Sequence, residues 1–273
     1  MGNQKPDKGE ERQPDSRESF VPIQNPEPGT RNPEPERVLL VAAVAKESRG
    51  VCAQIQNQQT VNFPAGVSAI FGTLIGQPVA LVLTGVGPVR AAAVLAVVLA
   101  QTPFSCVLQF GVGGAYPHSG LAIGDLVLAE SECDPQTGLE SPEGFRDLRG
   151  LGFPITDHFP NKQLLENKWI EFIARALPGV VRSGVATVAT CSATDALAER
   201  MEHLTGAKVE AMEGFPAAWV SAQFGIPFAE LRAISNTTGD RARQQWDLSR
   251  GCDVATEAVI TIFHKLTTDK VTG

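Results

Sequence analysis

The chain has 273 residues, of which 43% are hydrophobic, and a net charge of −7. This length and composition suit one large folded domain, while the acidic balance leaves no positively charged footprint for nucleic acid. The most apolar run, residues 91–100, is much shorter than the ~20 residues of a membrane-spanning helix, and the N-terminus carries no apolar signal stretch, so we expect a cytoplasmic protein without membrane contact.

Cysteine and histidine residues are scattered along the chain rather than grouped. The five cysteines are odd in number and form no C-x-x-C pair, and the four histidines do not cluster. This pattern predicts neither a disulfide framework nor a metal site, and it fits a reducing compartment.

The first 36 residues differ in composition from the rest. They contain 7 of the 19 prolines and 13 charged residues, with few large apolar side chains. Such a segment cannot bury enough surface to offset the entropy of ordering. We therefore predict a disordered tail over residues 1–36 and a single folded domain over residues 37–273.

Within that domain, apolar strand-like runs alternate with helical patterns. The predicted strands cover residues 38–44, 79–84, 106–110, 125–130, 180–190, a short segment ending at 209, and 228–235. One predicted helix begins near Pro88, and four more are predicted over residues 161–176, 194–204, 212–224 and 252–266. This alternation predicts an α/β fold in which helices cover both faces of a mostly parallel sheet.

Two glycine-rich stretches, Gly85-Val86-Gly87 and Gly111-Val112-Gly113-Gly114, resemble dinucleotide-binding loops but complete no G-x-G-x-x-G motif. Residues 91–110 also contain no acidic residue for a ribose hydroxyl, so a dinucleotide cofactor is not expected. Two explanations for the glycines stay open: close approach of backbone N–H groups to a ligand or water, and tight turns.

Three polar residues follow strand-like runs, at the sheet edge where α/β proteins bind ligands: Glu47, Glu213 and Asn236. A carboxylate can accept hydrogen bonds from a sugar diol or a proton from water, and an amide can read a purine edge. Each residue alone has an ordinary alternative. Glu47 can be a solvated loop charge, Glu213 an acid in a first helical turn, and Asn236 a turn former. Their pattern together favours a nucleoside site.

Two further segments are candidates for lining that site. Residues 190–194 end a strand and begin a helix, with Thr194 as the expected N-cap, and their backbone can line a base pocket. Trp246 lies in a polar segment, where it can either cover a ligand or anchor the loop. Trp219 is expected in the core.

Longer motifs resemble the purine nucleoside phosphorylase/nucleosidase superfamily, and within it the futalosine hydrolase branch. They are Thr84-Gly85-Val86-Gly87-Pro88, residues 110–116 and 120–125, Met212-Glu213-Gly214, and Ser235-Asn236 followed by Gly239, Arg241 and Trp246. The resemblance spans residues 38 to about 266. It implies a three-layer α/β/α fold with a mixed, mostly parallel central sheet, a homodimer or larger homo-oligomer, and no cofactor or metal.

The resemblance also implies residue roles. Glu213 would grip the ribose hydroxyls, Glu47 would position or deprotonate a water, and Asn236 would stabilise the departing base. The remaining residues expected around the nucleoside are Val112, Gly113, Cys191, Met212, Ser235, Arg241 and Trp246.

Two positions bear on substrate and reaction. Asn236 stands where adenine-specific relatives carry Asp, which favours a 6-oxopurine such as hypoxanthine. Val112 stands where relatives often carry a hydroxyl for phosphate or water, which favours hydrolysis of futalosine. Three alternatives stay open: a methylthioadenosine/S-adenosylhomocysteine-type nucleosidase, a 6-oxopurine phosphorylase that uses Arg49 or Arg90, and an inactive nucleoside-binding protein.

Overall fold

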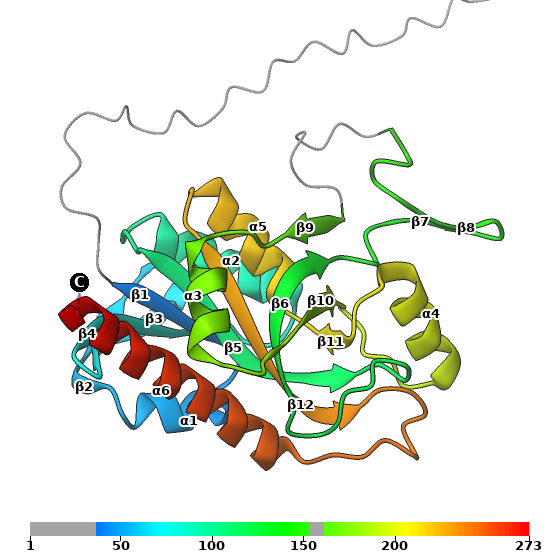
Figure 1. Cartoon of the computed structure of the whole chain (residues 1–273). Coiled ribbons are helices and arrows are strands. Elements are labelled where there is room, and N and C mark those ends of the chain that lie inside the picture. Colours follow the sequence, from blue (N-terminus) through cyan, green and yellow to red (C-terminus); the bar gives the residue numbers. More distant parts are fainter. Residues whose placement is uncertain (1–36, 153–160, 273) are drawn as a thin grey trace, which may run out of the picture. The chain divides into compact units, whose positions relative to one another are not determined.

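A computed structural model describes residues 37–152 and 161–272. The predicted tail over residues 1–36 lies outside the described residues. Within them, ten strands form one sheet in the order β11-β10-β6-β12-β5-β1-β4-β3-β2, with β9 paired to β6 (Figure 1). These strands are β1 (Val38–Ala42), β2 (Gln56–Asn62), β3 (Ser68–Leu74), β4 (Gln77–Leu83), β5 (Cys106–Ala115), β6 (Leu126–Cys133), β9 (Lys162–Leu164), β10 (Val181–Thr187), β11 (Val209–Ala211) and β12 (Phe228–Thr237).

The sheet is mixed, with a parallel centre. Strands β4, β1, β5 and β12 run parallel, whereas β12 and β6 are antiparallel. Strand β11 continues the β6–β10 side and also pairs with the end of β5, through Val209 with Ala115 and Glu210 with Gly114. This second pairing closes β5, β12, β6, β10 and β11 into a ring. The carboxyl ends of strands from both halves are thereby brought together.

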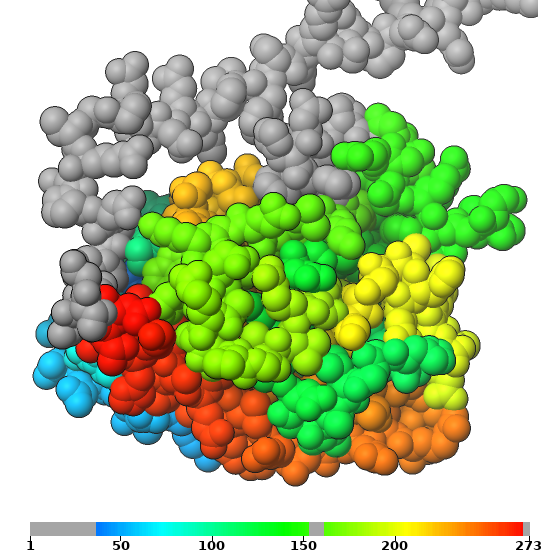
Figure 2. All heavy atoms as spheres, viewed as in Figure 1, coloured from blue at the N-terminus to red at the C-terminus, as the bar shows by residue number. Residues whose placement is uncertain are grey.

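Helices cover both faces of the sheet, which confirms the predicted α/β architecture. Helices α2 (Pro88–Leu99) and α5 (Gly214–Gln223) pack together on one face, while α1 (Ala45–Cys52), α3 (Lys168–Ala176) and α6 (Leu248–Thr272) lie on the other (Figure 1). In the space-filling view α6, in red and orange, adjoins the yellow-green segment that contains α3 (Figure 2). Helix α4 (Asp195–Thr205) packs on β10, and β7 (Gly138–Ser141) and β8 (Gly144–Asp147) form a separate hairpin.

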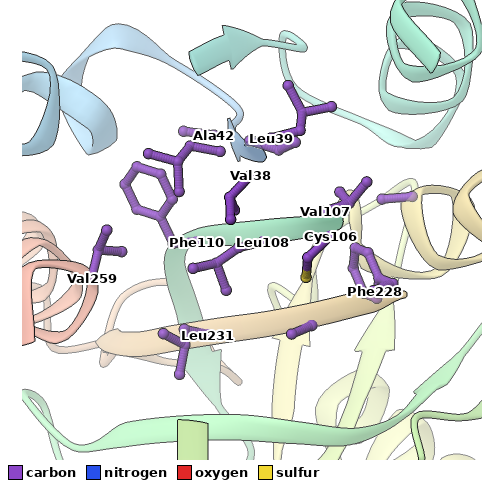
Figure 3. Packing of buried hydrophobic residues seen from close by; sticks show 14 of the residues in the cluster. Val38, Leu39, Ala42, Cys106, Val107, Leu108, Phe110, Phe228, Leu231 and Val259 are labelled. Atoms are coloured by element: carbon purple, nitrogen blue, oxygen red, sulfur yellow. The ribbon is translucent and has the colours of Figure 1, made fainter. Parts of the chain in front are cut away.

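The core lies where β1, β5 and β12 pass between the helical layers (Figure 3). All five residues of β1 are buried, as are Cys106–Phe110 of β5. An unbroken apolar run is expected of a parallel strand that is covered on both faces, so these strands were readable from the sequence. Val259 of α6 packs against this cluster.

Several predicted boundaries are wrong. The helix predicted over residues 161–176 begins only at Lys168, because Asn167 caps it by accepting from the backbone N–H groups of Trp169 and Ile170. Residues 162–164 instead form β9. The Gly111–Gly114 stretch lies inside β5, and Val209 begins a strand rather than ending one.

Other elements were not predicted. Helix α1, strands β2 and β3 and the β7–β8 hairpin carry no strong apolar period. Trp219, expected in the core, is partly exposed on α5. Among the helices of the described residues, none combines the length and apolar character needed to cross a membrane.

Helices α1 and α6 pack closely at Gly50. A Cβ at this position would lie 2.6 Å from Cγ2 and 2.7 Å from Oγ1 of Thr256. We expect Gly50→Ala to lower the free energy of unfolding by about 1–3 kcal/mol through overpacking, measured by urea denaturation. Adding Thr256→Ala removes both crowding atoms and should recover part of the loss. Additive losses in the double variant would contradict this close contact.

Candidate active site

All ten residues predicted for the site line one cavity of about 610 Å³. It lies at the carboxyl ends of β1, β5, β11 and β12, where α/β sheets bind ligands. Its volume suits a small-molecule site of a few hundred Å³. The predicted residues in its wall are Glu47, Val112, Gly113, Cys191, Met212, Glu213, Ser235, Asn236, Arg241 and Trp246.

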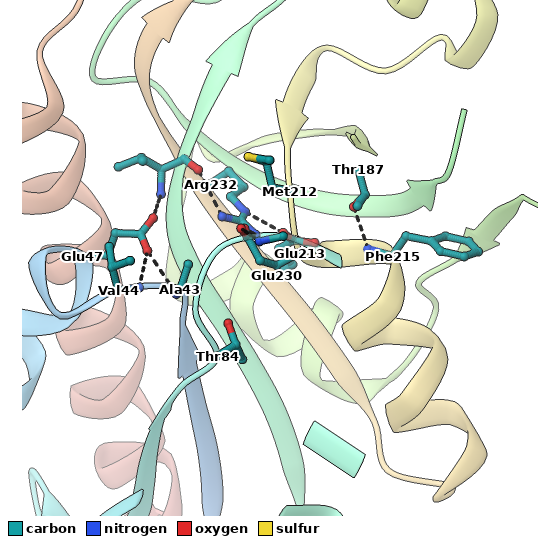
Figure 4. Close-up of polar contacts among 12 residues, drawn as sticks. Ala43, Val44, Glu47, Thr84, Thr187, Met212, Glu213, Phe215, Glu230 and Arg232 are labelled. Carbon is teal, nitrogen blue, oxygen red and sulfur yellow. Dashed lines mark hydrogen bonds and ion pairs between the residues drawn. The ribbon is translucent and has the colours of Figure 1, made fainter. Parts of the chain in front are cut away.

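Glu47 lies in the first turn of α1, and only 5% of it is exposed. Its Oε1 accepts from the backbone N–H of Val112 at 3.0 Å, and its Oε2 accepts from Ala43 at 3.1 Å and Val44 at 3.2 Å (Figure 4). The alternative of a solvated loop charge is therefore wrong. Three backbone donors from two strand ends hold this carboxylate in a single orientation.

Gly111 makes room for Glu47. A Cβ on Gly111 would lie 2.5 Å from Glu47 Oε1 and 3.2 Å from Nη1 of Arg232. The next glycines are crowded in the same way, since a Cβ on Gly114 would lie 2.9 Å from Nδ2 of Asn236. Of the two explanations left open for these glycines, tight turns apply only to Gly85 and Gly87, which have φ values of 77° and 101°.

Glu213 follows β11 and occupies the N-cap position of α5, with 4% exposure. Its Oε1 accepts from the backbone N–H of Gly87 at 3.1 Å, and its Oε2 accepts from Arg232 Nη2 at 3.2 Å (Figure 4). Burial raises the pKa of the Glu213 carboxyl, while Arg232 and the Gly87 N–H oppose the rise. Burial and these specific partners distinguish Glu213 from an ordinary acid in a first helical turn.

Arg232 is the largest buried side chain in the cavity wall, and sequence reasoning did not assign it to the site. Its Nε donates to Glu230 at 2.6 Å, its Nη2 to Glu213, and its Nη1 to the carbonyl oxygen of Val112 at 3.1 Å. A signal was present in the sequence. Glu230 and Arg232 are alternate residues within the otherwise apolar run of residues 228–234, so they point to the same face.

Asn236 is held by its neighbours in β12. Ser235 Oγ donates to Asn236 Oδ1 at 2.8 Å, and Asn236 Nδ2 donates to the carbonyl oxygen of Thr237 at 3.0 Å. This arrangement uses one lone pair of the amide oxygen and one of the two amide N–H groups. The second N–H is available to a ligand in the cavity.

The rim of the cavity is formed by the segment after β12. The Arg241 guanidinium lies over the Trp246 ring, 4.7 Å from its centroid, and Gln244 Oε1 accepts from both side chains. Trp246 is 50% exposed, and its backbone bridges to Asn236. Trp246 thus covers part of the cavity and also anchors the loop.

The opposite wall combines sulfur atoms with a second carboxylate. Cys191 Sγ lies 3.5 Å from Met212 Sδ. Glu210, which was not predicted, accepts from the Ser192 N–H at 2.9 Å, from the Ser192 hydroxyl at 2.5 Å and from Tyr116 OH at 3.2 Å. Burial raises the pKa of the Glu210 carboxyl. Glu210 is the middle residue of β11, and nothing in the sequence distinguished it as a site residue beside the Met212-Glu213 motif.

The basic residues proposed for a phosphate lie elsewhere. Arg49 and Arg90 are exposed and do not line the cavity, whereas Lys46 does. The backbone N–H groups of Val112 and Gly87 donate to carboxylates. Over residues 37–152 and 161–272, no group of three or more His, Cys, Asp or Glu side chains is arranged to hold a metal ion.

Comparisons with known proteins agree with this geometry. Residues 37–267 match the model of the phosphorylase superfamily. The chain is 35% identical over 184 residues to futalosine hydrolase of Streptomyces coelicolor, covering 66% of this chain and 76% of the relative. It is 32% identical over 211 residues to futalosine hydrolase of Acidothermus cellulolyticus, covering 77% and 83%.

Solved structures share the fold. The Neisseria meningitidis 5'-methylthioadenosine/S-adenosylhomocysteine nucleosidase, in complex with methylthio-immucillin-A, superposes with a TM-score of 0.70 at 22% identity, covering 83% of this chain and 98% of that one. Futalosine hydrolase of Helicobacter pylori superposes with a TM-score of 0.71 at 15% identity, covering 84% and 98%. With the family match, these findings show that the chain belongs to the phosphorylase superfamily and, within it, to the futalosine hydrolase family.

Proposed function

We propose that this protein hydrolyses the N-glycosidic bond of futalosine, releasing hypoxanthine and dehypoxanthine futalosine. The observation that carries the proposal is the convergence of Glu47, Glu213 and Asn236 on one cavity. These groups supply the three functions that the reaction needs: a base for water, a grip on the ribose and a donor to the leaving purine. The similarity to three futalosine hydrolases at 32–35% identity supports the proposal independently.

Glu47 is the proposed general base. Its three backbone bonds orient the carboxylate and leave one lone pair of Oε1 for a water molecule in the cavity that Glu47 lines. Glu47 accepts a proton from this water as the water oxygen bonds to C1′ of the ribose. The bond from C1′ to the purine nitrogen breaks, and its electron pair leaves with the base.

Glu213 is the proposed ribose ligand. Gly87 and Arg232 each bind one of its oxygens, so the carboxylate is fixed before substrate arrives. A fixed carboxylate that accepts from the ribose hydroxyls stabilises positive charge developing on the sugar. Bonds that strengthen in the transition state are those that raise the rate.

Asn236 is the proposed purine ligand. Asn236 donates only one of its two amide N–H groups within the described residues, so the other can donate to the base. O6 and N7 of a 6-oxopurine are acceptors, whereas the exocyclic amine of adenine would oppose this donor. The amide therefore favours hypoxanthine over adenine as the leaving base.

Water rather than phosphate is the proposed nucleophile. Phosphate binding calls for several donors that converge on one anion. The Val112 side chain offers none, its N–H donates to Glu47, and Arg49 and Arg90 lie outside the cavity. These features favour hydrolysis over phosphorolysis.

Lys46 and Arg241 fit the benzoate end of futalosine. Both line the cavity, and within the described residues neither forms an ion pair with a carboxylate. Arg232, in contrast, is bound to Glu213 and Glu230. A carboxylate-bearing nucleoside would supply the missing anion, whereas inosine has none. The homo-oligomeric state stays a prediction.

A substrate panel tests the proposed activity directly. We expect the enzyme to release hypoxanthine from futalosine at the same rate with and without phosphate. The released base is measured by chromatography. Methylthioadenosine should be poorer by ~10⁴-fold or more in kcat/KM, because the wrong base leaves a buried polar group unpaired. Dependence on phosphate, or efficient adenine release, would refute the proposal. As the control for the site, Glu47→Gln should keep the far-UV circular dichroism spectrum but lose turnover.

Lys46→Gln tests recognition of the benzoate. Loss of a charge-assisted contact worth about 1.5–3 kcal/mol should lower the ratio of kcat/KM for futalosine to that for inosine by about tenfold or more. Arg49→Gln, one turn along α1 and outside the cavity, is the matched control and should leave this ratio unchanged. If Lys46→Gln and wild type have the same futalosine-to-inosine ratio of kcat/KM, Lys46 does not bind the benzoate.

The raised pKa of Glu213 predicts an acidic limb in the pH profile. Burial disfavours the charged carboxylate, so the Glu213 carboxyl loses its proton at a higher pH than an ordinary glutamate, whose pKa is 4.5. In the proposed role it grips the ribose only when ionised. We therefore expect kcat/KM to rise with pH through a midpoint above 4.5. The measurement is kcat/KM across the pH range in which circular dichroism shows a folded enzyme. A flat profile there would contradict the prediction.

A further inference from the structure

Two carboxyl groups are buried side by side beneath the start of α5. Glu132 on β6 and Glu230 on β12 are both 0% exposed. Glu132 Oε1 and Glu230 Oε2 have no other hydrogen-bond partner within the described residues. Both atoms converge on Gly214, where an added Cβ would collide with each of them. Two buried carboxylates in such contact cannot both stay ionised, but a single shared proton would pair the two oxygens.

The other oxygen of each carboxyl group has a different partner. Glu132 Oε2 accepts from the Thr187 hydroxyl at 2.9 Å. The Thr187 oxygen in turn accepts from the Phe215 N–H at 2.8 Å, the bond drawn between these two residues in Figure 4. Glu230 Oε1 accepts from Arg232 Nε at 2.6 Å. The neutral hydroxyl therefore faces Glu132 and the cation faces Glu230. This difference decides which carboxyl group keeps the proton.

We propose that Glu132 and Glu230 share one proton, carried by Glu132, and act as positioning residues that hold Arg232 against Glu213. Glu132 donates through Oε1 to Glu230 Oε2. Glu230 keeps its negative charge beside Arg232, which reaches Glu213 and the Val112 carbonyl with its remaining nitrogens. Two interactions therefore connect the shared proton to the proposed ribose ligand.

Electrostatics agree with this placement. Burial, followed by the Glu230 carboxylate, raises the pKa of the Glu132 carboxyl well above its ordinary value. The charged groups around the pair are Arg232 on β12, Glu213 at the start of α5 and Glu47 on α1. With Glu132 neutral, one fewer anion lies near the buried Arg232 guanidinium.

A matched pair of substitutions separates charge placement from packing. In Glu132→Gln, the amide donates to Glu230 and accepts from Thr187, so the charge stays beside Arg232. In Glu230→Gln, the same hydrogen bonds can form, but the charge moves to Glu132, away from Arg232. The effect on turnover rests on the proposed function. We expect Glu132→Gln to retain kcat within about threefold and Glu230→Gln to lose about 10- to 100-fold through misplacement of Glu213.

Equal activities of the two variants would overturn the positioning role, because a purely structural pair would tolerate both substitutions alike. Circular dichroism and thermal unfolding show whether each variant folds. If Glu230→Gln fails to fold, Glu230→Asp with Glu132→Gln as background tests the same charge at a shifted position, and full activity there would equally refute the role.

Two measurements without substrate test the proton itself. Infrared spectra at neutral pH should contain the carbonyl stretch of a protonated carboxylic acid that is absent from Glu132→Gln, and an unchanged spectrum would refute the shared proton. The stability that the wild type gains from holding this proton is complete below the ordinary pKa of 4.5 and is lost as pH rises through the raised pKa. The stability of Glu132→Gln relative to wild type should therefore increase with pH.

These readouts also separate failure of the inference from failure of the proposed function. If wild-type protein releases no hypoxanthine from futalosine, the proposed function is wrong, while the infrared band still decides whether the pair is protonated. If wild-type protein is active but the band is missing, the inference is wrong and the function stands.

Discussion

The structure depends on one buried cation. Arg232 lies in the middle of β12, where the strand passes between two helical layers, and removing a guanidinium from water costs several kcal/mol unless it is fully paired. Its partners come from three places: Glu230 on the same strand, the Val112 carbonyl on β5, and Glu213 at the start of α5. Satisfying this cation therefore fixes the relative positions of β5, β12 and α5, and with them the side of the cavity proposed to bind the ribose.

The second constraint is that backbone donors orient the functional carboxylates. Glu47 takes three N–H groups from the ends of β1 and β5, and Glu213 takes one from the turn at Gly87. These backbone groups are held by the fold and do not reorient as water does, so both carboxylates are fixed in advance for the roles proposed for them. The glycines of β5 serve this arrangement because they leave space for Glu47 and Asn236.

Much of this arrangement could be predicted from residues at strand ends. The buried strands carry continuous apolar runs, so the polar residues at the ends of these runs were recognisable: Glu47 and Glu213 after their strands, and Asn236 near the end of β12. Arg232 and Glu132 were missed because they lie inside strands, where a pattern of apolar residues says nothing about which charged side chains meet across neighbouring strands. Strand β2 was missed for the opposite reason: its exposed sequence Gln-Asn-Gln-Gln-Thr-Val-Asn has no apolar face, and it forms by pairing with β3.

The charges of the cavity fall into two groups with different consequences. In the interior, Glu213 and Glu230 both pair with Arg232, so a change to any one of the three alters the energy of the others. At the rim, Lys46 and Arg241 are exposed and bound to no carboxylate within the described part of the chain. Substitutions there do not leave a buried charge unpaired. On the proposed assignment, the contacts to the far end of the substrate can therefore change without disturbing those to the ribose and the base.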